Sequence, residues 1–544
     1  MGVRRKNAVL LILLAVILVF VGCSQGSGGS GSAGSGSSGS GSSGGSTGGG
    51  SSGGSGSGGD SSGGGSEEPI VISWLSEDPP KEDGMLAQKY LEEKFNVRFV
   101  NHKIETSVYR EKLNLLLSSG TIPDVMWGRF DIQQLYEQGV IAPIPISEIR
   151  EYMPNYSKSI NDFNPVLWRL QSFDGVNYGI PLYNIYGNLP RLPLYRMDWL
   201  RNIGYDHTPQ TIEEMEDVFT KFTYNDPDQN GKNDTYAFSN RGKDALARTM
   251  DFVFSHFGIQ PYYWRLGADG KLEFSMITEE AREGFKVLNR WYEMGLIDPE
   301  FAVHDAKAFE NLFLTSRTGV LQSNVLALSY PSGVKTSKSA LFEAVPTAEV
   351  VAGMLQNGYT PGITYRPFVF GIQMKDQPEK RKKVYEMLEA MATDPETHLM
   401  TYFGIEGEHY DIVDGGIVPR GDLADAEYRG RELGAGPFYN PFGDFSTPLM
   451  LTMYETTELR EFREYVQQNS SGILNEVKFP IPAAADYPDL QKLQDEYFVK
   501  FIVGEVDLDQ GFDNFVELWK RSGGQAVTDS ANEVYAKLMN MEIR

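Results

Sequence analysis

Apolar positions in the first part of the folded chain follow two alternating patterns. Short runs rich in β-branched and aromatic residues predict β-strands at 69–74, 97–100 and 124–127. Apolar residues recur at helical spacing between and after these runs, which predicts helices at 84–95, 108–117 and 132–138. Strands that alternate with helices form parallel sheets with crossover helices, so we expect an α/β fold.

The chain beyond about residue 180 has a mainly helical pattern. The spacing of its apolar residues predicts helices at 211–223, 244–257, 278–294, 379–393, 458–468, 487–502 and 512–521. A small strand is predicted at 271–275, after a turn at 268–270. The folded part is too long for one ordinary hydrophobic core. We therefore expect two lobes, of which the second is rich in helix.

The N-terminus has the pattern of an export signal. Basic residues at 4–6 precede an uncharged apolar stretch at 8–21, and Gly22 stands before Cys23. This order is typical of a bacterial lipoprotein, so we expect residues 1–22 to be a cleaved signal peptide and Cys23 to be lipidated. An uncleaved membrane anchor is disfavoured because the stretch is short for a spanning helix. An ordinary signal peptide with Cys23 incidental is the other alternative.

The segment 23–66 continues from the cysteine as an almost pure Gly and Ser tract. This composition cannot bury a core and behaves as a flexible tether. Its root-mean-square span would be roughly 35 Å. A folded body that begins near residue 67 would therefore stand clear of the membrane.

Charge and cysteine content narrow the possible functions. The formal net charge is -24, and Cys23 is the only cysteine. A polyanion is repelled by nucleic acid, so we expect no nucleic-acid partner. Without a second cysteine there is no disulfide framework, and stability must come from the hydrophobic core. We expect a monomer.

No catalytic motif emerges from the sequence. The six histidines form no H-E-x-x-H motif, and neither a G-x-S-x-G sequence nor a phosphate-binding loop is present. We therefore predict no catalytic residue. A glycoside hydrolase needs a pair of catalytic carboxylates. With 73 acidic residues, pairs arise by chance, so the sequence does not decide whether such a pair is present.

The sharpest local motif is the Asp-rich loop at 226–234. Oxygen-bearing side chains recur there at alternate positions around Gly231, and calcium prefers several hard oxygen ligands in a flexible loop. A structural Ca²⁺ would take side-chain oxygens and one backbone carbonyl from Asp226, Asp228, Asn230, Asp234 and Lys232. The loop is not an EF-hand, because Ala237 stands where an EF-hand carries its bidentate Glu. The alternative is a polar surface turn, which uses the same residue types.

A second set of residues suits a carbohydrate ligand. In open α/β sheets the ligand lies beyond the carboxyl ends of the strands. Aromatic faces there suit the apolar faces of sugar rings, and charged or amide side chains serve the hydroxyls. The candidates at predicted strand ends and loops are Trp74, Glu77, Trp127, Arg129, Tyr183, Tyr186, Asn188, Trp264, Tyr365, Arg366 and Tyr410. For each aromatic residue the alternative is a place in the core.

Several motifs, taken in order and spacing, resemble a known family. They stand at 115–124, 139–144, 178–182, 196–200, 291–300 and 404–410. Together they make the chain similar to the lipid-anchored extracellular solute-binding proteins of bacterial ABC importers. The likeness is greatest to the oligosaccharide-binding branch, which includes alginate-oligosaccharide-binding proteins.

This resemblance implies a periplasmic-binding-protein-like fold with two α/β lobes joined by hinge-crossing segments. The first lobe would begin with 67–185 and be completed by about 340–400. The second lobe would begin with 186–339, which contains the Asp-rich loop. The segment 340–544 would return to both lobes and end in helices.

The resemblance also implies a binding protein rather than an enzyme. It would capture a carbohydrate between its lobes and deliver it to a transmembrane permease and ATPase, at the outer face of the cytoplasmic membrane. A peptide receptor of the same fold and a surface-anchored glycoside hydrolase are the alternatives. Alginate-binding relatives hold calcium in the equivalent loop, where a Glu usually follows the last Asp. Thr235 stands at that place here.

Overall fold

The computed structural model describes residues 68–542, apart from 247–248, 325–340, 356, 361–365 and 446. The predicted signal peptide and tether, with Cys23, lie outside the described residues, as does Tyr365.

The first lobe is built on a four-stranded sheet with the order β12-β3-β1-β2. Its strands are β1 (Ile70–Ser76), β2 (Val97–Lys103), β3 (Val125–Met126) and β12 (Val369–Phe370). β1 pairs in parallel with β2 and β3, which confirms the predicted crossover pattern, whereas β12 runs antiparallel to β3. The carboxyl ends of β1 and β3 and the start of β12 therefore meet at one edge of the sheet.

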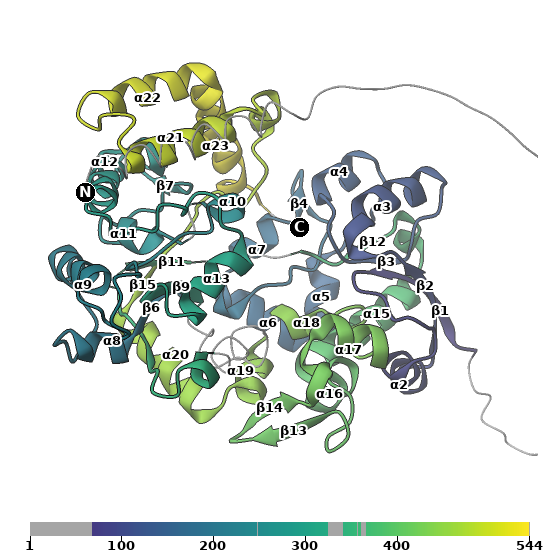
Figure 1. Cartoon of the computed structure of the whole chain (residues 1–544). Coiled ribbons are helices and arrows are strands. Elements are labelled where there is room, and N and C mark those ends of the chain that lie inside the picture. Colours follow the sequence, from purple (N-terminus) through teal and green to yellow (C-terminus); the bar gives the residue numbers. More distant parts are fainter. Residues whose placement is uncertain are drawn as a thin grey trace, which may run out of the picture. The chain divides into compact units, whose positions relative to one another are not determined.

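Helices surround this sheet (Figure 1). Those of the first half of the lobe are α2 (Leu86–Phe95), α3 (Tyr109–Ser118), α4 (Ile132–Glu137), α5 (Ile146–Tyr152), α6 (Pro154–Phe163) and α7 (Val166–Arg169). The returning chain adds α15 (Pro378–Thr393), α16 (Pro395–Tyr402), α17 (Ala426–Leu433), α18 (Phe442–Phe445) and α19 (Pro448–Tyr454). The predicted helices at 84–95, 108–117, 132–138 and 379–393 are confirmed within a few residues. α2 is followed by the capping residue Asn96, whose φ of 50° lies in the left-handed region that terminates helices.

The second lobe has an antiparallel three-stranded sheet with the order β10-β6-β9. Its strands are β6 (Arg191–Arg196), β9 (Val320–Asn324) and β10 (Val350–Ala352). The main helices of this lobe are α8 (Met197–Asn202), α9 (Ile212–Tyr224), α12 (Glu279–Glu293), α13 (Ala306–Leu314), α20 (Thr457–Asn469), α21 (Leu490–Val503), α22 (Gly511–Trp519) and α23 (Gln525–Met539). Phe285 of α12 packs on Phe498 and Phe501 of α21, with ring centroids 5.1 and 5.0 Å apart.

The single helix predicted at 244–257 is wrong. The structure has α10 (Gly242–Ala245) and α11 (Asp251–Ser255) instead. The Thr249 hydroxyl accepts a hydrogen bond from the backbone N–H of Arg241 at 3.1 Å. This bond ties Thr249 to the residue before α10, and Thr249 itself lies outside both helices.

The remaining strands form two-stranded pairs. These are β4 (Ser172–Phe173) with β5 (Val176–Asn177), β7 (Trp264–Leu266) with β8 (Leu272–Phe274), β11 (Asn357–Tyr359) with β15 (Ser471–Ile473), and β13 (Tyr410–Val413) with β14 (Gly416–Pro419). β8 confirms the strand predicted at 271–275.

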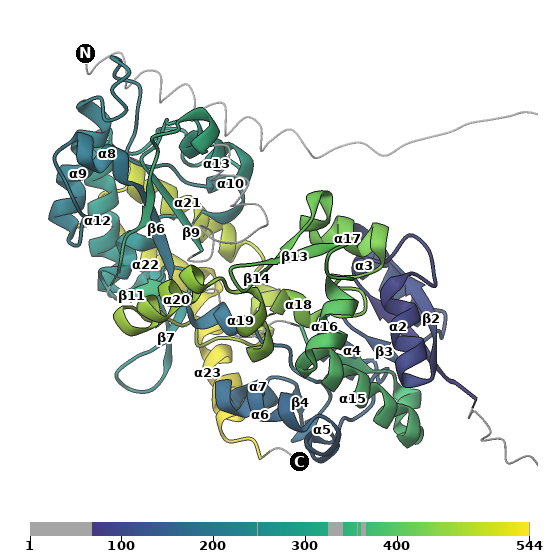
Figure 2. The ribbon, with the colours of Figure 1, turned by 90° about the horizontal axis from the view of Figure 1, so that it is seen from below.

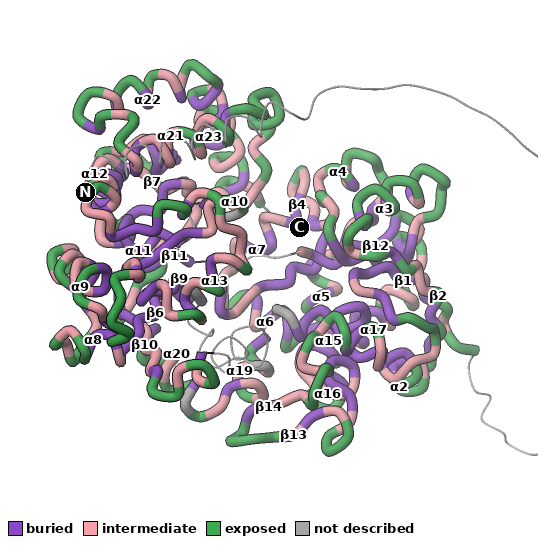
Figure 3. The backbone as a smooth tube through the Cα atoms, viewed as in Figure 1, coloured by how far each residue is buried: buried purple, intermediate pink, exposed green. Residues whose placement is uncertain are grey.

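The buried apolar side chains form two large cores, one for each lobe. Figure 3 shows buried stretches of chain in both lobes. The first core draws on residues between 72 and 183 and between 368 and 442. The second draws on residues between 192 and 355 and between 466 and 531. The same two groups of elements are seen from below in Figure 2. This arrangement is the expected two-lobe α/β fold. Within the described part of the chain, no helix is both long and apolar enough to cross a membrane.

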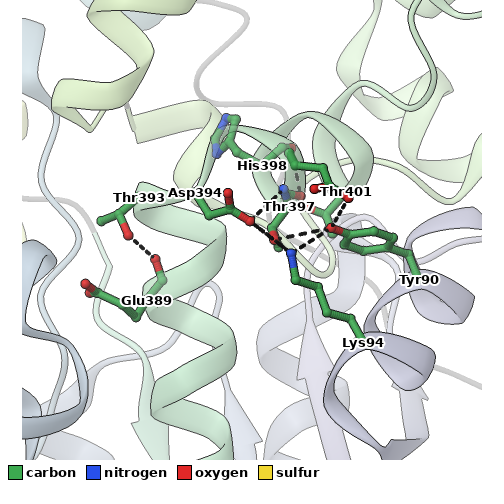
Figure 4. A network of polar contacts seen from close by, with 9 residues as sticks. Tyr90, Lys94, Glu389, Thr393, Asp394, Thr397, His398 and Thr401 are labelled. Carbon is green, nitrogen blue, oxygen red and sulfur yellow. Dashed lines mark hydrogen bonds and ion pairs between the residues drawn. The ribbon is translucent and has the colours of Figure 1, made fainter.

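A polar network joins the beginning of the first lobe to its returning chain (Figure 4). The Lys94 ammonium of α2 donates to Asp394 at 3.0 Å and to the Thr397 hydroxyl at 2.7 Å. Asp394 is also the N-cap of α16, because its carboxylate accepts from the backbone N–H of Thr397 at 3.2 Å. Contacts between segments about 300 residues apart therefore hold the first lobe together.

His398 lies fully buried directly after this network. Its Nδ1–H donates to the carbonyl of Met391 at 2.7 Å, so Nε2 is left to accept from the Tyr454 hydroxyl, also at 2.7 Å. Burial lowers the pKa of His398 to about 4. The folded protein therefore holds this imidazole neutral where an unfolded chain protonates it.

We expect the free energy of unfolding to fall as the pH drops from 6.5 to 4, because only the unfolded chain binds a proton at His398 in that range. The loss should approach about 3 kcal/mol near pH 4. Urea unfolding at pH 4.5 and pH 7 measures it, and H398Q should flatten this dependence. H207Q, which changes an exposed histidine, is the control and should behave as wild type. An unchanged pH dependence in H398Q would contradict the assignment.

Candidate functional site

Three charged side chains meet at the carboxyl edge of the first sheet. Glu77 directly follows β1, Arg129 follows β3, and Arg366 precedes β12. The Arg366 guanidinium lies 2.5 Å from Oε2 of Glu77, and Nε of Arg129 lies 3.2 Å from Oε1. Glu77 is only 3% exposed, whereas half of the Arg129 side chain is accessible. The edge therefore presents arginine donors that are held by a buried carboxylate.

Trp127 forms the floor of this cluster. It is buried, and the Arg366 guanidinium lies 5.7 Å from the centroid of its ring. The indole N–H donates to the Arg366 carbonyl at 3.2 Å. The ring thus supports the arginine through a cation–π contact and is not an open platform for a ligand.

The Tyr109 side chain holds the backbone at Trp127 and Gly128 in place. The Tyr109 hydroxyl donates to the Trp127 carbonyl at 2.9 Å. Gly128 follows with a φ of 148°, and an added Cβ there would lie 2.5 Å from the Tyr109 ring. Burial raises the pKa of Tyr109 well above its usual range, so this hydroxyl stays protonated and donates.

Asp78 completes the turn after β1. Its φ of 53° is in the left-handed region, and its carboxylate accepts from the Thr106 hydroxyl at 2.5 Å. A non-glycine residue in this conformation is strained and tends to be found at binding and catalytic sites. The turn directs Glu77 towards the two arginines.

Several predicted ligand residues lie in the cores instead, which corrects their assignment. Trp74 is fully buried among Phe99, Phe368 and Tyr439, and its indole N–H donates to the Phe438 carbonyl at 2.8 Å. A ring covered on both faces cannot stack on a sugar. The same holds for Tyr183, Trp264 and Tyr410, which pack on Phe163, Phe274 and Phe403 respectively. Asn188 is the last residue of the short 3-10 helix η2 (Ile185–Asn188).

Tyr186, also in η2, belongs to a buried ion pair between segments that connect the lobes. Its hydroxyl donates to Glu455 at 3.0 Å. Arg463 binds both oxygens of the same carboxylate, at 2.6 and 3.0 Å, and Glu455 is fully buried. The Tyr186 side chain is therefore buried in a connecting segment, with its hydroxyl bound to Glu455. Sequence reasoning missed Glu455 and Arg463, because nothing in the sequence pairs this Glu with Tyr186.

The Asp-rich loop brings its predicted side-chain ligands together. Asp226 accepts from the backbone N–H groups of Asn230 and Gly231, both at 2.9 Å. The Asn230 amide nitrogen lies 2.8 Å from Asp228 and 3.3 Å from Asp234. Partial burial raises the pKa of Asp228, and the neighbouring carboxylates of Asp226 and Asp234 add to this. The grouping is a set of hard oxygen donors.

Two hydrogen bonds show that this loop is not a preformed calcium site. The Thr235 hydroxyl turns away and donates to the Phe222 carbonyl at 2.7 Å. Lys232 contributes a backbone N–H to the Asn230 side-chain oxygen at 2.8 Å. Across the residues that the structure describes, no group of three or more His, Cys, Asp or Glu side chains is arranged to hold a metal ion.

A cavity of about 680 Å³ lies beside this loop in the second lobe. Asp228 and Gln229 line it together with Arg196 and Trp199. Arg196 is buried and is held by both oxygens of Asp198, at 2.8 and 2.6 Å. The charges in the cavity wall are therefore largely paired within the protein.

Comparisons with known proteins agree with this architecture. Residues 85–312 match the family model of bacterial extracellular solute-binding proteins. Lipoprotein LipO of Bacillus subtilis is 25% identical over 82% of this chain and 87% of its own length. The polygalacturonan/rhamnogalacturonan-binding protein YtcQ of the same organism is 24% identical over 87% of this chain and 92% of its own length.

A solved structure has the same fold. The Streptococcus pneumoniae substrate-binding protein FusA in complex with kestose superimposes with a TM-score of 0.60 at 18% identity, over 86% of this chain and 99% of that one. The alginate-binding protein AlgQ2, solved without calcium ion, gives a TM-score of 0.57 at 18% identity, over 86% and 98%. The predicted resemblance is confirmed, and the matched family is one of binding proteins rather than enzymes.

The buried ion pair of Glu455 predicts a large effect of removing its partner. R463M should lower the free energy of unfolding by about 3–5 kcal/mol, because it leaves an uncompensated buried carboxylate. The double variant R463M/E455L should recover much of this loss. K500M, which breaks the exposed pair with Glu496, is the control and should cost about 0–1 kcal/mol. Equal losses for R463M and K500M in urea unfolding would show that the Glu455 pair is not buried in solution.

Proposed function

We propose that this chain, a bacterial extracellular solute-binding protein by its matched family model, captures an oligosaccharide between its lobes for delivery to an ABC importer. The observation that carries the proposal is the Glu77–Arg129–Arg366 cluster at the carboxyl edge of the first sheet. Open α/β sheets bind ligands at this edge. YtcQ is named for binding polygalacturonan/rhamnogalacturonan and FusA for a fructooligosaccharide, and both names support a carbohydrate ligand.

The cluster has the chemistry to hold sugar hydroxyls. Glu77 fixes the two guanidinium groups, so that little side-chain entropy is lost when they bind a ligand. Arginine carries several N–H donors in a rigid plane, and those not directed at Glu77 can serve hydroxyl oxygens. Exclusion of water on binding strengthens each of these hydrogen bonds.

Closure of the lobes would couple binding to transport. The ligand shifts an open–closed equilibrium only by its differential affinity for the closed form. The crossing segments near Tyr186 and Glu455 would bend in this movement while their ion pair keeps them together. A transmembrane permease with its ATPase would then recognise the closed form.

The proposal includes lipid attachment at Cys23, with the Gly/Ser tract as a tether at the outer face of the cytoplasmic membrane. The name of the relative LipO, a lipoprotein, supports it. C23S should move the protein from the membrane fraction into the medium.

Calcium at the Asp-rich loop is the remaining part of the proposal. The side chains of Asp226, Asp228, Asn230 and Asp234 would hold it, together with the Lys232 carbonyl. The oxygen chemistry of the set and the hydrogen bonds that link Asn230 to Asp226, Asp228 and Asp234 support this. The ion would stabilise the loop and take no part in ligand capture. Calorimetric titration of metal-stripped protein with calcium tests it.

Ligand binding should depend on the arginines of the cluster. R366M is expected to weaken oligosaccharide binding by about 10- to 100-fold, because a hydrogen bond to a charged group contributes about 1.5–3 kcal/mol. R129M, at a half-exposed side chain, should act in the same direction with less loss of stability. Calorimetry with kestose-type and oligogalacturonide ligands measures both.

R420M is the matched control, since it removes an arginine from the exposed pair with Asp411 and should bind as wild type. The melting temperature of each variant separates loss of binding from loss of fold. Wild-type protein that binds peptides and none of the oligosaccharides would reject the carbohydrate assignment in favour of the peptide receptor.

A further inference from the structure

We propose that Arg317 is a built-in counter-cation of the Asp-rich loop. It holds Asp234 in the metal-free protein and competes with calcium for that carboxylate. This inference rests on the calcium site proposed above, and it concerns how strongly this chain binds the ion. The Arg317 guanidinium lies 2.9 Å from Oδ2 of Asp234.

The backbone fixes Arg317 beside the loop independently of the ion pair. Its N–H donates to the Leu312 carbonyl at 2.7 Å, and its own carbonyl accepts from the N–H of Tyr236 at 2.9 Å. Tyr236 is two residues beyond Asp234. Ser316, with a φ of 56°, makes the turn that brings Arg317 to this place. The backbone of Arg317 therefore stays beside the loop whether or not its guanidinium binds Asp234.

The loop is also held at both ends without a metal ion. The Asn202 amide donates to the Pro227 carbonyl at 2.7 Å, near the start of the loop. The buried Thr235 hydroxyl donates to the Phe222 carbonyl at 2.7 Å, directly after the last aspartate. Within the loop, Asp226 binds the backbone at 230 and 231. Protein groups thus hold both ends of the loop in place in the metal-free protein.

Thr235 and Arg317 both lower the calcium affinity of the loop. Thr235 supplies no carboxylate, and its hydroxyl is already used. Arg317 occupies one oxygen of Asp234 and places a positive charge where it repels an incoming Ca²⁺. The pair is partly exposed, so its hold on Asp234 is modest, and a metal ion can displace it. The loop should therefore respond to calcium concentration and not retain the ion permanently.

Calcium titration of the mature, metal-stripped protein tests this. R317Q should bind calcium about three- to tenfold more tightly than wild type, because it removes both the competing ion pair and one nearby positive charge. R317M should show the same tightening, and R317K, which keeps the charge, should stay close to wild type. R290Q is the matched control, since it breaks a similarly exposed pair with Glu216 and should leave calcium affinity unchanged.

Melting temperature gives a second readout. Without calcium, R317Q should melt below wild type, and saturating calcium should raise its melting temperature by more than that of wild type. Equal or weaker calcium binding by R317Q and R317M would overturn the role of Arg317 while leaving the calcium site in place. No binding by any of the proteins at millimolar calcium would overturn the calcium site, and this proposal with it.

Discussion

The first lobe depends on one buried carboxylate. An ionised Glu77 at 3% exposure would cost several kcal/mol if it were left alone, so its position requires cationic partners. Arg129 comes from the neighbouring strand end, but Arg366 arrives 289 residues later, with the antiparallel strand β12. The edge of the sheet is therefore complete only when the chain has returned from the second lobe. The same pairing that makes Glu77 tolerable also leaves arginine donors where a ligand would lie.

The second buried carboxylate repeats this arrangement between the lobes. Glu455 joins Tyr186 from the first connection to Arg463 of the later connection, and it is fully buried. Tying two connecting segments together limits the ways in which the lobes can move against each other. The apolar side chains of Leu189 and Leu459 pack beside Tyr186, so the two connections are joined by a small core as well as by the ion pair.

Much of the fold could be predicted from the sequence, because helical and strand periodicities are local properties. The strands and helices between residues 70 and 138 are observed nearly as predicted. The helix predicted at 244–257 was wrong: the structure has two short helices there, and the Thr249 hydroxyl between them accepts from the backbone N–H of Arg241. The aromatic ligand candidates were mostly wrong as well. A strand covered on both faces buries its aromatics whichever way they point, so Trp74 at a strand end carries no mark of its role.

The charged candidates lie close together in the structure. Glu77 and Arg129 follow predicted strands, Arg366 was taken from a predicted loop, and Glu77 pairs with both arginines. Their pairing could not be predicted, since it depends on contacts across most of the chain. The ion pair of Glu455 with Arg463 has no sequence signature at all. It remains a prediction that Glu77, Arg129 and Arg366 contact the ligand.

The most direct test of the central claim is hydrogen–deuterium exchange of the wild-type protein, with and without a saturating oligosaccharide that it binds. If the arginine cluster forms the binding edge, backbone amides around residues 77, 129 and 366 should become protected together on binding. Those around the Asp-rich loop should stay unchanged at constant calcium. Tight binding without protection at these three segments would place the ligand elsewhere and contradict the account.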